Sequence, residues 1–453
     1  MRKHPLRLAT AVAAALALVM TGCSSGGDSG DPNTLKVWWW ETDDSALSAA
    51  WKQAVSIFEK EHPGVTVKQE LKTYEQMQQS GQLILDSNDT PDVLEYLKGN
   101  ATAGVVAKAG LLSDLTEVAK TRGWKLDNTA QDVGLYDDNG LMGSGKRYGI
   151  TNYGEYVGVW YNQDLFAQHN VQVPTTLAEF ENALKTFSDK GVTPLALGSA
   201  DYPGPHLLYS LALAHMDEQS LAAYQRFEGD VDWSAWEKAA TTMRQWVERK
   251  YISTDSTGIP AQDAGNAFIA GQYPMFVSGT WWSGQFAEQP TFKTGQFLFP
   301  GNELHPGSGG NLWVVPAKAK NKDLAYDFLE ITQRPEVQNF LADKGGVPVA
   351  AEPGSASSAM GLLVGDRFTE LLSGDRGGLA LYPDWPVAGL NDVLLANTTD
   401  LVGGDASPHR AGGGAGLNEG LRANPRGGGG GAPPPHQVVE AIKTAYDAGK
   451  PTA

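Results

Sequence analysis

The sequence contains a single cysteine among 453 residues. A lone cysteine cannot form a disulfide within the chain, so the fold must be held together by its own hydrophobic core. The eight histidines lie far apart and none forms an HxxxH pair, which leaves no zinc motif. After the first 22 residues there is no run of about 18 apolar residues, so no transmembrane helix is expected.

Basic residues are also scarce. The chain has 35 Lys and Arg against 52 Asp and Glu, which gives a formal charge of −17. A protein of this charge is repelled by nucleic acid and by anionic lipid headgroups, so neither is expected as a partner. The hydrophobic fraction of 41% is typical of a globular protein, and the length predicts two or three domain-sized units.

The N-terminus reads as an export signal. Three basic residues precede an apolar run of 13 residues at 8–20, which suits a signal peptide and is too short to span a bilayer. The sequence Met20-Thr21-Gly22-Cys23 then resembles a lipobox, with Met20 where leucine is usual. We therefore predict a signal peptide at 1–22, a lipid on the Cys23 thiol, and a polar tether at 23–33. Loss of three positive charges takes the mature chain from −17 to about −20.

Strands and helices alternate along most of the chain, which predicts an α/β protein whose first sheet is largely parallel. The expected strands are residues 35–40, 65–67, 91–96, 157–161, 194–197, 275–277 and 311–316, and the expected helices are residues 45–60, 74–85, 175–187, 207–216, 233–249, 265–271, 322–333, 335–343 and 437–448.

Residues 403–435 have a different composition. They hold 12 of the 53 glycines and five prolines, including the run Gly427–Gly431. Such a segment cannot bury enough apolar surface to order itself, so we predict a disordered linker. It is either an insertion or the trace of a disturbed reading frame.

One motif suggests a nucleotide site and is rejected. Residues 140–146 read GLMGSGK, which fits the first part of a phosphate-binding loop. That loop needs Ser or Thr next, and Arg147 stands there. The expected buried strand and following helix are also missing from the local pattern. A hairpin turn is the better interpretation.

Other catalytic or metal motifs are equally weak. Asp137-Asp138-Asn139 lacks the spacing and the closing glutamate of a calcium loop, and no GxSxG elbow occurs. No cofactor is predicted. Acidic clusters such as Glu41, Asp43 and Asp44 leave a carbohydrate-active enzyme open as an alternative, because paired carboxyls hydrolyse glycosides.

The informative residues are aromatic. Several of the 13 tryptophans stand at strand ends beside polar groups, where ligands bind in open α/β sheets. A flat ring there can stack on the C–H face of a sugar, while carboxylates and amides bind its hydroxyls. Adjacent tryptophans cannot both face one core, because strand side chains alternate. By contrast, the helical or strand-interior positions predict core packing for Trp51, Trp160, Trp236 and Trp246.

In order and spacing, five parts of the mature chain resemble the family 1 extracellular solute-binding proteins, the maltose-binding-like sugar receptors of ABC importers. The matching stretches are LKVW at 35–38; TPDV at 90–93 with AGLLSDL at 109–115; KRYGI at 146–150 with WYNQDLF at 160–166; MFVSGTW at 275–281; and AKAKNKDLA at 317–325 with FL at 328–329.

The resemblance implies a two-lobed periplasmic-binding-protein-like fold, with hinge crossovers and a ligand cleft between lobes. Lobe 1 would comprise 34–154 and 309–360, and lobe 2 would comprise 155–308 and 361–453. It also implies a monomeric, non-enzymatic receptor, lipid-anchored at the extracellular face of the cell membrane. This receptor binds a carbohydrate, a di- or oligosaccharide, and delivers it to ABC permease subunits. The alternatives are the secreted enzyme and a receptor of the same fold for a non-sugar solute.

The same resemblance implies the ligand contacts. Trp281 matches the stacking tryptophan of the second lobe, and Glu155 matches a sugar-binding acid. Gly99 departs from the pattern, since the maltose-binding relative has an acid there. The implicated residues are Trp39, Trp40, Glu41, Asn100, Tyr153, Glu155, Tyr156, Asp201, Tyr202, Trp281, Trp282, Asn311, Trp313 and Trp385.

Overall fold

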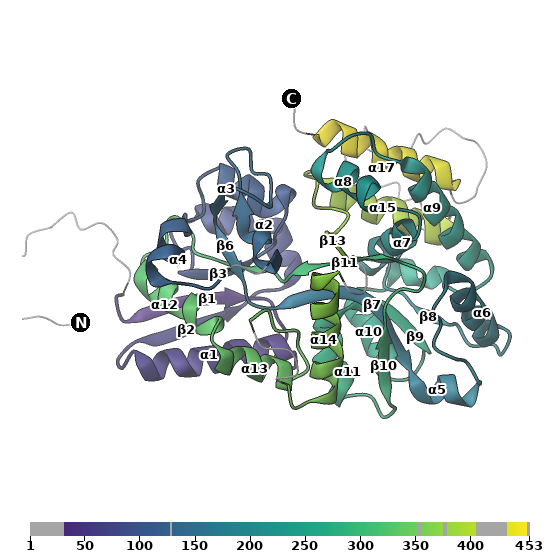
Figure 1. Cartoon of the computed structure of the whole chain (residues 1–453), viewed down its shortest axis with the longest axis horizontal. Helices are drawn as coiled ribbons and strands as arrows, with labels where there is room; N and C mark the ends of the chain where they lie inside the picture. The colour runs from purple at the N-terminus through teal and green to yellow at the C-terminus, as the bar shows by residue number, and fades with distance from the viewer. Residues whose placement is uncertain (1–30, 127–128, 351–355, 375–377, 405–432, 451–453) are drawn as a thin grey trace, which may run out of the picture.

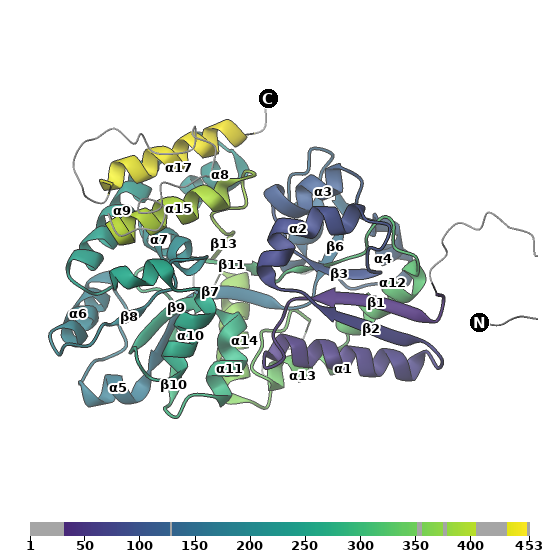
Figure 2. The same cartoon turned by 180° about the vertical axis from the view of Figure 1, so that it is seen from behind.

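The computed structural model of the chain describes residues 31–126, 129–350, 356–374, 378–404 and 433–450. Two lobes lie side by side, each with a sheet covered by helices (Figures 1 and 2). The two-lobed α/β fold expected from the sequence is thus confirmed. The predicted signal peptide, Cys23 and most of the tether lie outside the described residues, as do residues 405–432 of the predicted linker.

The first sheet has the strand order β2-β1-β3-β12-β6. β1 (Thr34–Trp39) pairs in parallel with β2 (Thr66–Leu71) and β3 (Val93–Tyr96). β12 (Leu312–Val314) enters from the second lobe and lies antiparallel to β3 and to β6 (Gly149–Thr151). The prediction of a largely parallel sheet is therefore wrong for two of its four strand pairs, because a strand that returns through a crossover runs in the opposite direction.

Four of the six helices described in the first lobe begin and end within one residue of the predicted bounds, whereas the short helices at 105–108 and 116–122 were not predicted. The Ser45 hydroxyl accepts the backbone N–H of Ser48 at 3.0 Å and so caps the first helix, as the sequence indicated. The helices are α1 (Ala46–Glu61), α2 (Tyr74–Asp86), α3 (Val105–Lys108), α4 (Thr116–Arg122), α12 (Lys322–Thr332) and α13 (Pro335–Asp343), with short turns η1 (Asn100–Gly104) and η2 (Thr129–Gly134).

The second sheet has the order β13-β11-β7-β9-β8, with β10 also paired to β7. β7 (Gly154–Asn162) is its central strand and lies antiparallel to β9, β10 and β11. Eight of its nine residues are buried, which explains the almost continuous apolar sequence of this strand. The other strands are β8 (Leu195–Ala196), β9 (Met275–Gly279), β10 (Thr294–Phe297), β11 (Leu304–Gly309) and β13 (Gly378–Ala380).

Helices cover the second sheet and extend beyond it. Among the helices described, none is both long and apolar enough to cross a lipid bilayer. The helices on this side are α5 (Gln163–Gln168), α6 (Leu177–Ser188), α7 (Pro203–Leu213), α8 (Glu218–Arg226), α9 (Trp233–Glu248), α10 (Ala261–Ile269), α11 (Ser283–Glu288), α14 (Ala359–Ser373), α15 (Leu390–Gly403) and α17 (Pro435–Gly449), with short turns η3 (Thr254–Gly258) and η4 (Thr280–Trp282).

The chain passes between the sheets at two short segments. β6 ends at Thr151 and β7 begins at Gly154, while β11 ends at Gly309 and β12 begins at Leu312. A Cβ on Gly310 would lie 2.5 Å from the ring of Tyr153, so the two segments approach each other closely only because Gly310 has no side chain. Short, paired crossovers of this kind are where a two-lobed protein can bend.

The rejected phosphate-loop motif is a hairpin turn, as predicted. β4 (Leu135–Tyr136) and β5 (Lys146–Arg147) pair antiparallel on either side of it. Gly145 has φ +91°, and a Cβ there would lie 2.4 Å from the Tyr136 carbonyl oxygen. The glycines of this motif therefore serve the turn and not a phosphate.

The C-terminal helix α17 completes the second lobe. Tyr446 is fully buried, stacks on Tyr224 with ring centroids 5.0 Å apart, and donates a hydrogen bond to the Tyr224 carbonyl at 2.6 Å. We expect Tyr446→Ala to lower the free energy of unfolding by about 3 kcal/mol, because it leaves a cavity in this aromatic core. Urea denaturation tests this, and a loss below about 1 kcal/mol would show that α17 is only loosely attached.

Candidate functional site

A buried ion pair links the two sheets. Lys98 follows β3 by two residues and Glu155 is the second residue of β7; their side chains form a salt bridge and are only 2% and 5% exposed. The Lys98 ammonium also lies 3.4 Å from Asn311 Oδ1, and the Asn311 amide donates to the Tyr153 hydroxyl at 2.8 Å. Burial lowers the pKa of Lys98, and the charge of Glu155 opposes that shift. This network stands beside both crossovers.

Two carboxyl groups are in contact next to the ion pair. Glu95 in β3 is 1% exposed, its Oε2 accepts the N–H of Trp40 at 3.3 Å, and its carboxyl group contacts that of Glu41. Burial, with the charge of Glu155 second, raises the pKa of Glu41 to about 8, and burial raises the pKa of Glu95 well above its ordinary value. Since two touching carboxylates repel, the pair keeps a proton at neutral pH.

An aromatic series runs from one lobe to the other. Trp40 and Tyr74 of the first lobe meet edge to face at 6.1 Å, and Tyr74 meets Tyr202 of the second lobe at 6.3 Å. Tyr202 in turn packs against Trp281 at 5.5 Å and accepts a hydrogen bond from its indole N–H at 3.0 Å. Rings that are separate in sequence thus form one continuous series of contacts across the junction.

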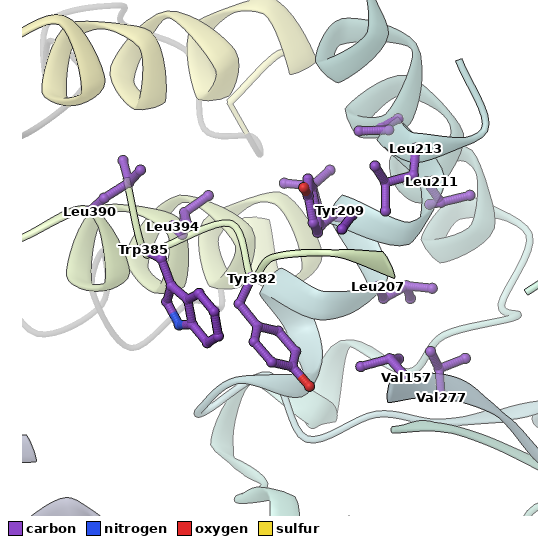
Figure 3. Packing of buried hydrophobic residues seen from close by; sticks show 14 of the residues in the cluster. Val157, Leu207, Tyr209, Leu211, Leu213, Val277, Tyr382, Trp385, Leu390 and Leu394 are labelled. Carbon is purple, nitrogen blue, oxygen red and sulfur yellow. The ribbon is translucent and has the colours of Figure 1, made fainter. Parts of the chain in front are cut away.

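A second aromatic group lies beside the Lys98 ammonium. Tyr382 and Trp385 extend from the loop before α15 (Figure 3), with ring centroids 5.1 Å apart. The Lys98 ammonium is 5.7 Å from the Tyr382 ring and 5.1 Å from the Trp385 ring, which is cation–π distance. His206 of α7 stacks on Tyr382 at 4.9 Å, and burial followed by the Lys98 charge lowers its pKa to about 3, so the imidazole is neutral.

We call this assembly the junction cluster. It contains seven aromatic rings or imidazoles, four carboxyl groups, one ammonium group and, beside the crossovers, the hydrogen-bonding residues Tyr153 and Asn311. Its members are Trp40, Glu41, Tyr74, Glu95, Lys98, Tyr153, Glu155, Tyr202, His206, Trp281, Asn311, Tyr382, Asp384 and Trp385.

The loop after β3 meets the loop before α15 directly. Gly99 has φ +114°, and a Cβ there would lie 2.9 Å from Cγ of Trp385. The Asn100 amide donates to the Pro386 carbonyl at 3.3 Å, while its oxygen accepts the N–H of Met142. The glycine at position 99, where an acid was expected, therefore leaves the space that Trp385 occupies.

The lobes also touch at the rim, away from the cluster. The Asp44 carboxylate accepts hydrogen bonds from Gln285 of α11 and from Gln289, which directly follows this helix, both at 2.9 Å. A Cβ on Gly284 would lie 3.0 Å from that of Ala46, so the start of α1 and α11 are in close contact. Contacts between the lobes at rim and centre indicate a closed arrangement.

Four of the predicted ligand contacts are core residues instead. Trp39 and Trp313 are fully buried and meet edge to face at 6.3 Å under the first sheet. Tyr156 is fully buried in the second lobe, and Trp282 stacks on Phe286 at 5.3 Å. In each adjacent pair the other member, Trp40 or Trp281, belongs to the junction cluster. Strand alternation explains why Trp39 and Trp40 face opposite ways. Trp281 and Trp282 both lie in the helical turn η4, where successive side chains also point in different directions.

Asp201 has a structural role that its loop position did not reveal. Its carboxylate accepts the N–H of Ala261 at 2.9 Å, at the first residue of α10. An acidic group at this place stabilises the start of a helix. Asp201 is therefore not assigned to ligand binding, although its neighbour Tyr202 belongs to the cluster.

Sequence reasoning missed several cluster members. Lys98 and Glu95 were detectable in principle, because both stand at the carboxyl end of the third strand, where ligand sites form. From the loop before α15, only Trp385 was predicted. Its neighbour Asp384 also belongs to the cluster, and burial raises the pKa of the Asp384 carboxyl group to about 6. The missed residues are Tyr74, Glu95, Lys98, His206, Tyr382 and Asp384.

A cavity of about 760 Å³ lies elsewhere, between η2, the ends of β11 and α14. Asp217, Glu303, Ser308 and Leu371 are among the residues that line it. None of the predicted contacts borders this cavity. Among the described residues, no group of three or more His, Cys, Asp or Glu is placed to hold a metal ion.

Comparison with known proteins gives one family. The family described as bacterial extracellular solute-binding protein matches residues 38–339. The "Multiple sugar-binding protein" of Streptococcus mutans is 24% identical over 322 residues, which are 68% of this chain and 73% of that protein. The "Melibiose/raffinose/stachyose-binding protein MelE" of Bacillus subtilis is 22% identical over 349 residues, 73% of this chain and 78% of that protein.

Solved structures extend the similarity over nearly the whole chain. A "Chitin oligosaccharide binding protein" has a TM-score of 0.72 at 20% identity and covers 92% of this chain and 98% of its own. "SBP RafE in complex with raffinose" has a TM-score of 0.66 at 21% identity, with 92% and 99% covered. At these identities the similarity establishes the fold.

Proposed function

This chain belongs to the bacterial extracellular solute-binding proteins, and we propose that it is a carbohydrate receptor that delivers its ligand to an ABC permease. The curated relatives named above bind sugars, which supports the assignment. The observation that carries it is the junction cluster, in which aromatic side chains of both lobes surround buried carboxyl groups. In this proposal residues 34–154 and 309–360 form one lobe and residues 155–308 and 361–453 the other.

The chemistry of the cluster suits a sugar. Trp40, Tyr74 and Trp281 offer ring faces or edges to the C–H groups of a pyranose, and Glu155 and Asn311 offer oxygen and nitrogen atoms to its hydroxyls. Because these groups come from both lobes, a sugar between them stabilises the closed arrangement and not an open one. A surface of several rings favours a di- or oligosaccharide over a single sugar unit.

We propose binding without turnover. The carboxyl groups nearest the crossovers are engaged with protein partners: Glu155 with Lys98, and Glu95 with the Trp40 N–H and Glu41. Such groups act as hydrogen-bond partners in a receptor and need not transfer protons. In the alternative, a secreted carbohydrate-active enzyme, two of them would serve as acid and nucleophile.

A thermal-shift screen against neutral mono- to tetrasaccharides tests the function. We expect a saturable rise in melting temperature with at least one di- or oligosaccharide, because a ligand that binds only the folded state stabilises it. Chromatography of the same mixtures after prolonged incubation should show the sugar unchanged. Released products would favour the enzyme, and no shift with any saccharide would contradict a sugar receptor.

We propose that Cys23 carries the lipid that holds a monomeric receptor at the extracellular face of the membrane. Cys23→Ala is expected to release the protein into the medium, because no other membrane-binding feature was found in the sequence. The affinity for sugar should not change, since Cys23 precedes residue 34, where the first proposed lobe begins. Fractionation of cells and medium, with calorimetry on the released protein, measures both effects. A Cys23→Ala protein that stays with the membrane would contradict the lipid anchor.

A further inference from the structure

The junction cluster has more acidic than basic groups. Its carboxyl groups are Glu41, Glu95, Glu155 and Asp384, and Lys98 is the cationic side chain that faces them in the described part of the chain. Lys98 is already paired with Glu155. The remaining titratable neighbours, among them His206, are neutral at pH 7: burial depresses the pKa of the imidazole and raises those of the tyrosines. These neutral groups are Tyr74, Tyr153, Tyr202, His206 and Tyr382.

The Glu41–Glu95 pair is where a positive charge is missing. Glu95 Oε2 accepts the N–H of Trp40, whereas Oε1 is buried and no donor of the described residues reaches it. The Glu41 carboxyl contacts Glu95 and is the group that could fill this need, but only if it keeps a proton. Without that proton or a cation, the buried Glu95 carboxylate would lie against a second carboxylate.

The surrounding rings suit a cation better than an anion. Lys98 already places its ammonium 5.1 Å from the Trp385 ring centroid and 5.7 Å from that of Tyr382. Trp40 stands beside the carboxyl pair and packs on Tyr74. A ligand ammonium at the pair would therefore meet carboxylates for charge-assisted hydrogen bonds and ring edges and faces for cation–π contact.

We propose that the saccharide bound here carries an amino group, whose ammonium takes the place of the proton that Glu41 and Glu95 share. This rests on the proposed function and specifies the class of sugar that the proposed receptor binds. The exchange is balanced: the ammonium enters, one proton leaves to solvent, and the carboxyl pair together with its proton or ammonium carries one net negative charge in both states. A neutral sugar, by contrast, leaves the proton in place and binds through hydroxyl hydrogen bonds.

Matched pairs of sugars provide the test. The disaccharide of β-1,4-linked glucosamine differs from cellobiose only by amino groups in place of the 2-hydroxyls, and the trisaccharides and the monosaccharides glucosamine and glucose form parallel pairs. Titration calorimetry at about pH 6, where the amine is charged, should show the amino member of a bound pair about tenfold or more tighter. Repeating it in buffers of different ionisation enthalpy should show about one proton released with the amino sugar and none with the neutral sugar.

The variant Glu95→Gln tests whether Glu95 is responsible for the tighter binding of the amino sugar. It keeps the shape of the side chain but removes the charge that an ammonium would need, so the ratio of the two affinities should fall to within about twofold. Glu117→Gln on the exposed first turn of α4 is the matched control and should leave the ratio as it is. Circular dichroism and melting curves confirm that both variants fold.

Equal or tighter binding of the neutral member, or tighter amine binding without proton release, overturns the amine proposal and leaves the sugar receptor intact. If no member of these series binds, and the neutral saccharide screen also gives no melting shift, both proposals fail together. If that screen finds another neutral saccharide, its amino counterpart takes the place of the glucosamine disaccharide in the same comparison.

Discussion

Replacing Lys98 by methionine is expected to lower the free energy of unfolding by about 3–5 kcal/mol, since it leaves the Glu155 carboxylate buried without its partner. The side chains are 2% and 5% exposed, so water cannot replace the lost ammonium. The Ser308 hydroxyl lies 3.5 Å from Glu155 Oε1, but it already donates to the Gly309 carbonyl at 2.6 Å. Urea denaturation of single and double variants measures the effect.

The double variant Lys98→Met with Glu155→Gln separates pairing from packing. It removes both charges at once, so it should recover most of the stability that Lys98→Met alone loses. Lys185→Met is the surface control: its salt bridge with Asp189 has side chains about 60% exposed and should contribute less than about 1 kcal/mol. A loss for Lys98→Met as small as that of the surface control would mean that the junction is hydrated and the pair is not a structural link.

Most of the fold could be predicted from the chain because its signals are local. Ser45 caps α1 through its own hydroxyl, and the core positions of Trp51 and Trp160 follow from helix and strand periodicity. The direction of β12 could not be predicted in this way. That strand pairs with β3 and β6, which lie far away in sequence, and nothing in three residues encodes the crossover that reverses it.

The same contrast between local signals and contacts distant in sequence applies to the site. Strand alternation correctly required Trp39 and Trp40 to face different surfaces, but it could not say which of them meets the second lobe. Glu95 reads as one acid in an ordinary strand, and only its contact with Glu41, 54 positions earlier, makes it chemically unusual. Gly99 departs from the family pattern in the sequence, and the structure gives the reason: Trp385 occupies the space that a side chain at position 99 would need. Local sequence patterns cannot assign residues whose role depends on contact between the two lobes.

Trp281→Ala is expected to lower the affinity for the bound sugar by about 2 kcal/mol or more, roughly 30-fold, as truncation of a buried aromatic anchor does. Trp281 is partly buried between Tyr202 and His206, and its indole N–H is already held by the Tyr202 hydroxyl. The ring is therefore fixed before a sugar arrives, and a preorganised ring loses little entropy on binding. Titration calorimetry with the saccharide found in the thermal-shift screen measures the loss.

Two further variants decide what such a loss means. Trp124→Ala removes an equally large, partly buried ring from the surface of the first lobe, where its indole N–H donates to Glu330 at 3.3 Å, and it should leave the affinity unchanged. Tyr202→Phe keeps both rings but removes the hydroxyl that holds Trp281, so its effect should lie between those of wild type and Trp281→Ala. If Trp281→Ala binds sugar as tightly as Trp124→Ala does, Trp281 closes the gap between the lobes without touching the ligand. The sugar would then have to be sought among Trp40, Tyr382 and Trp385.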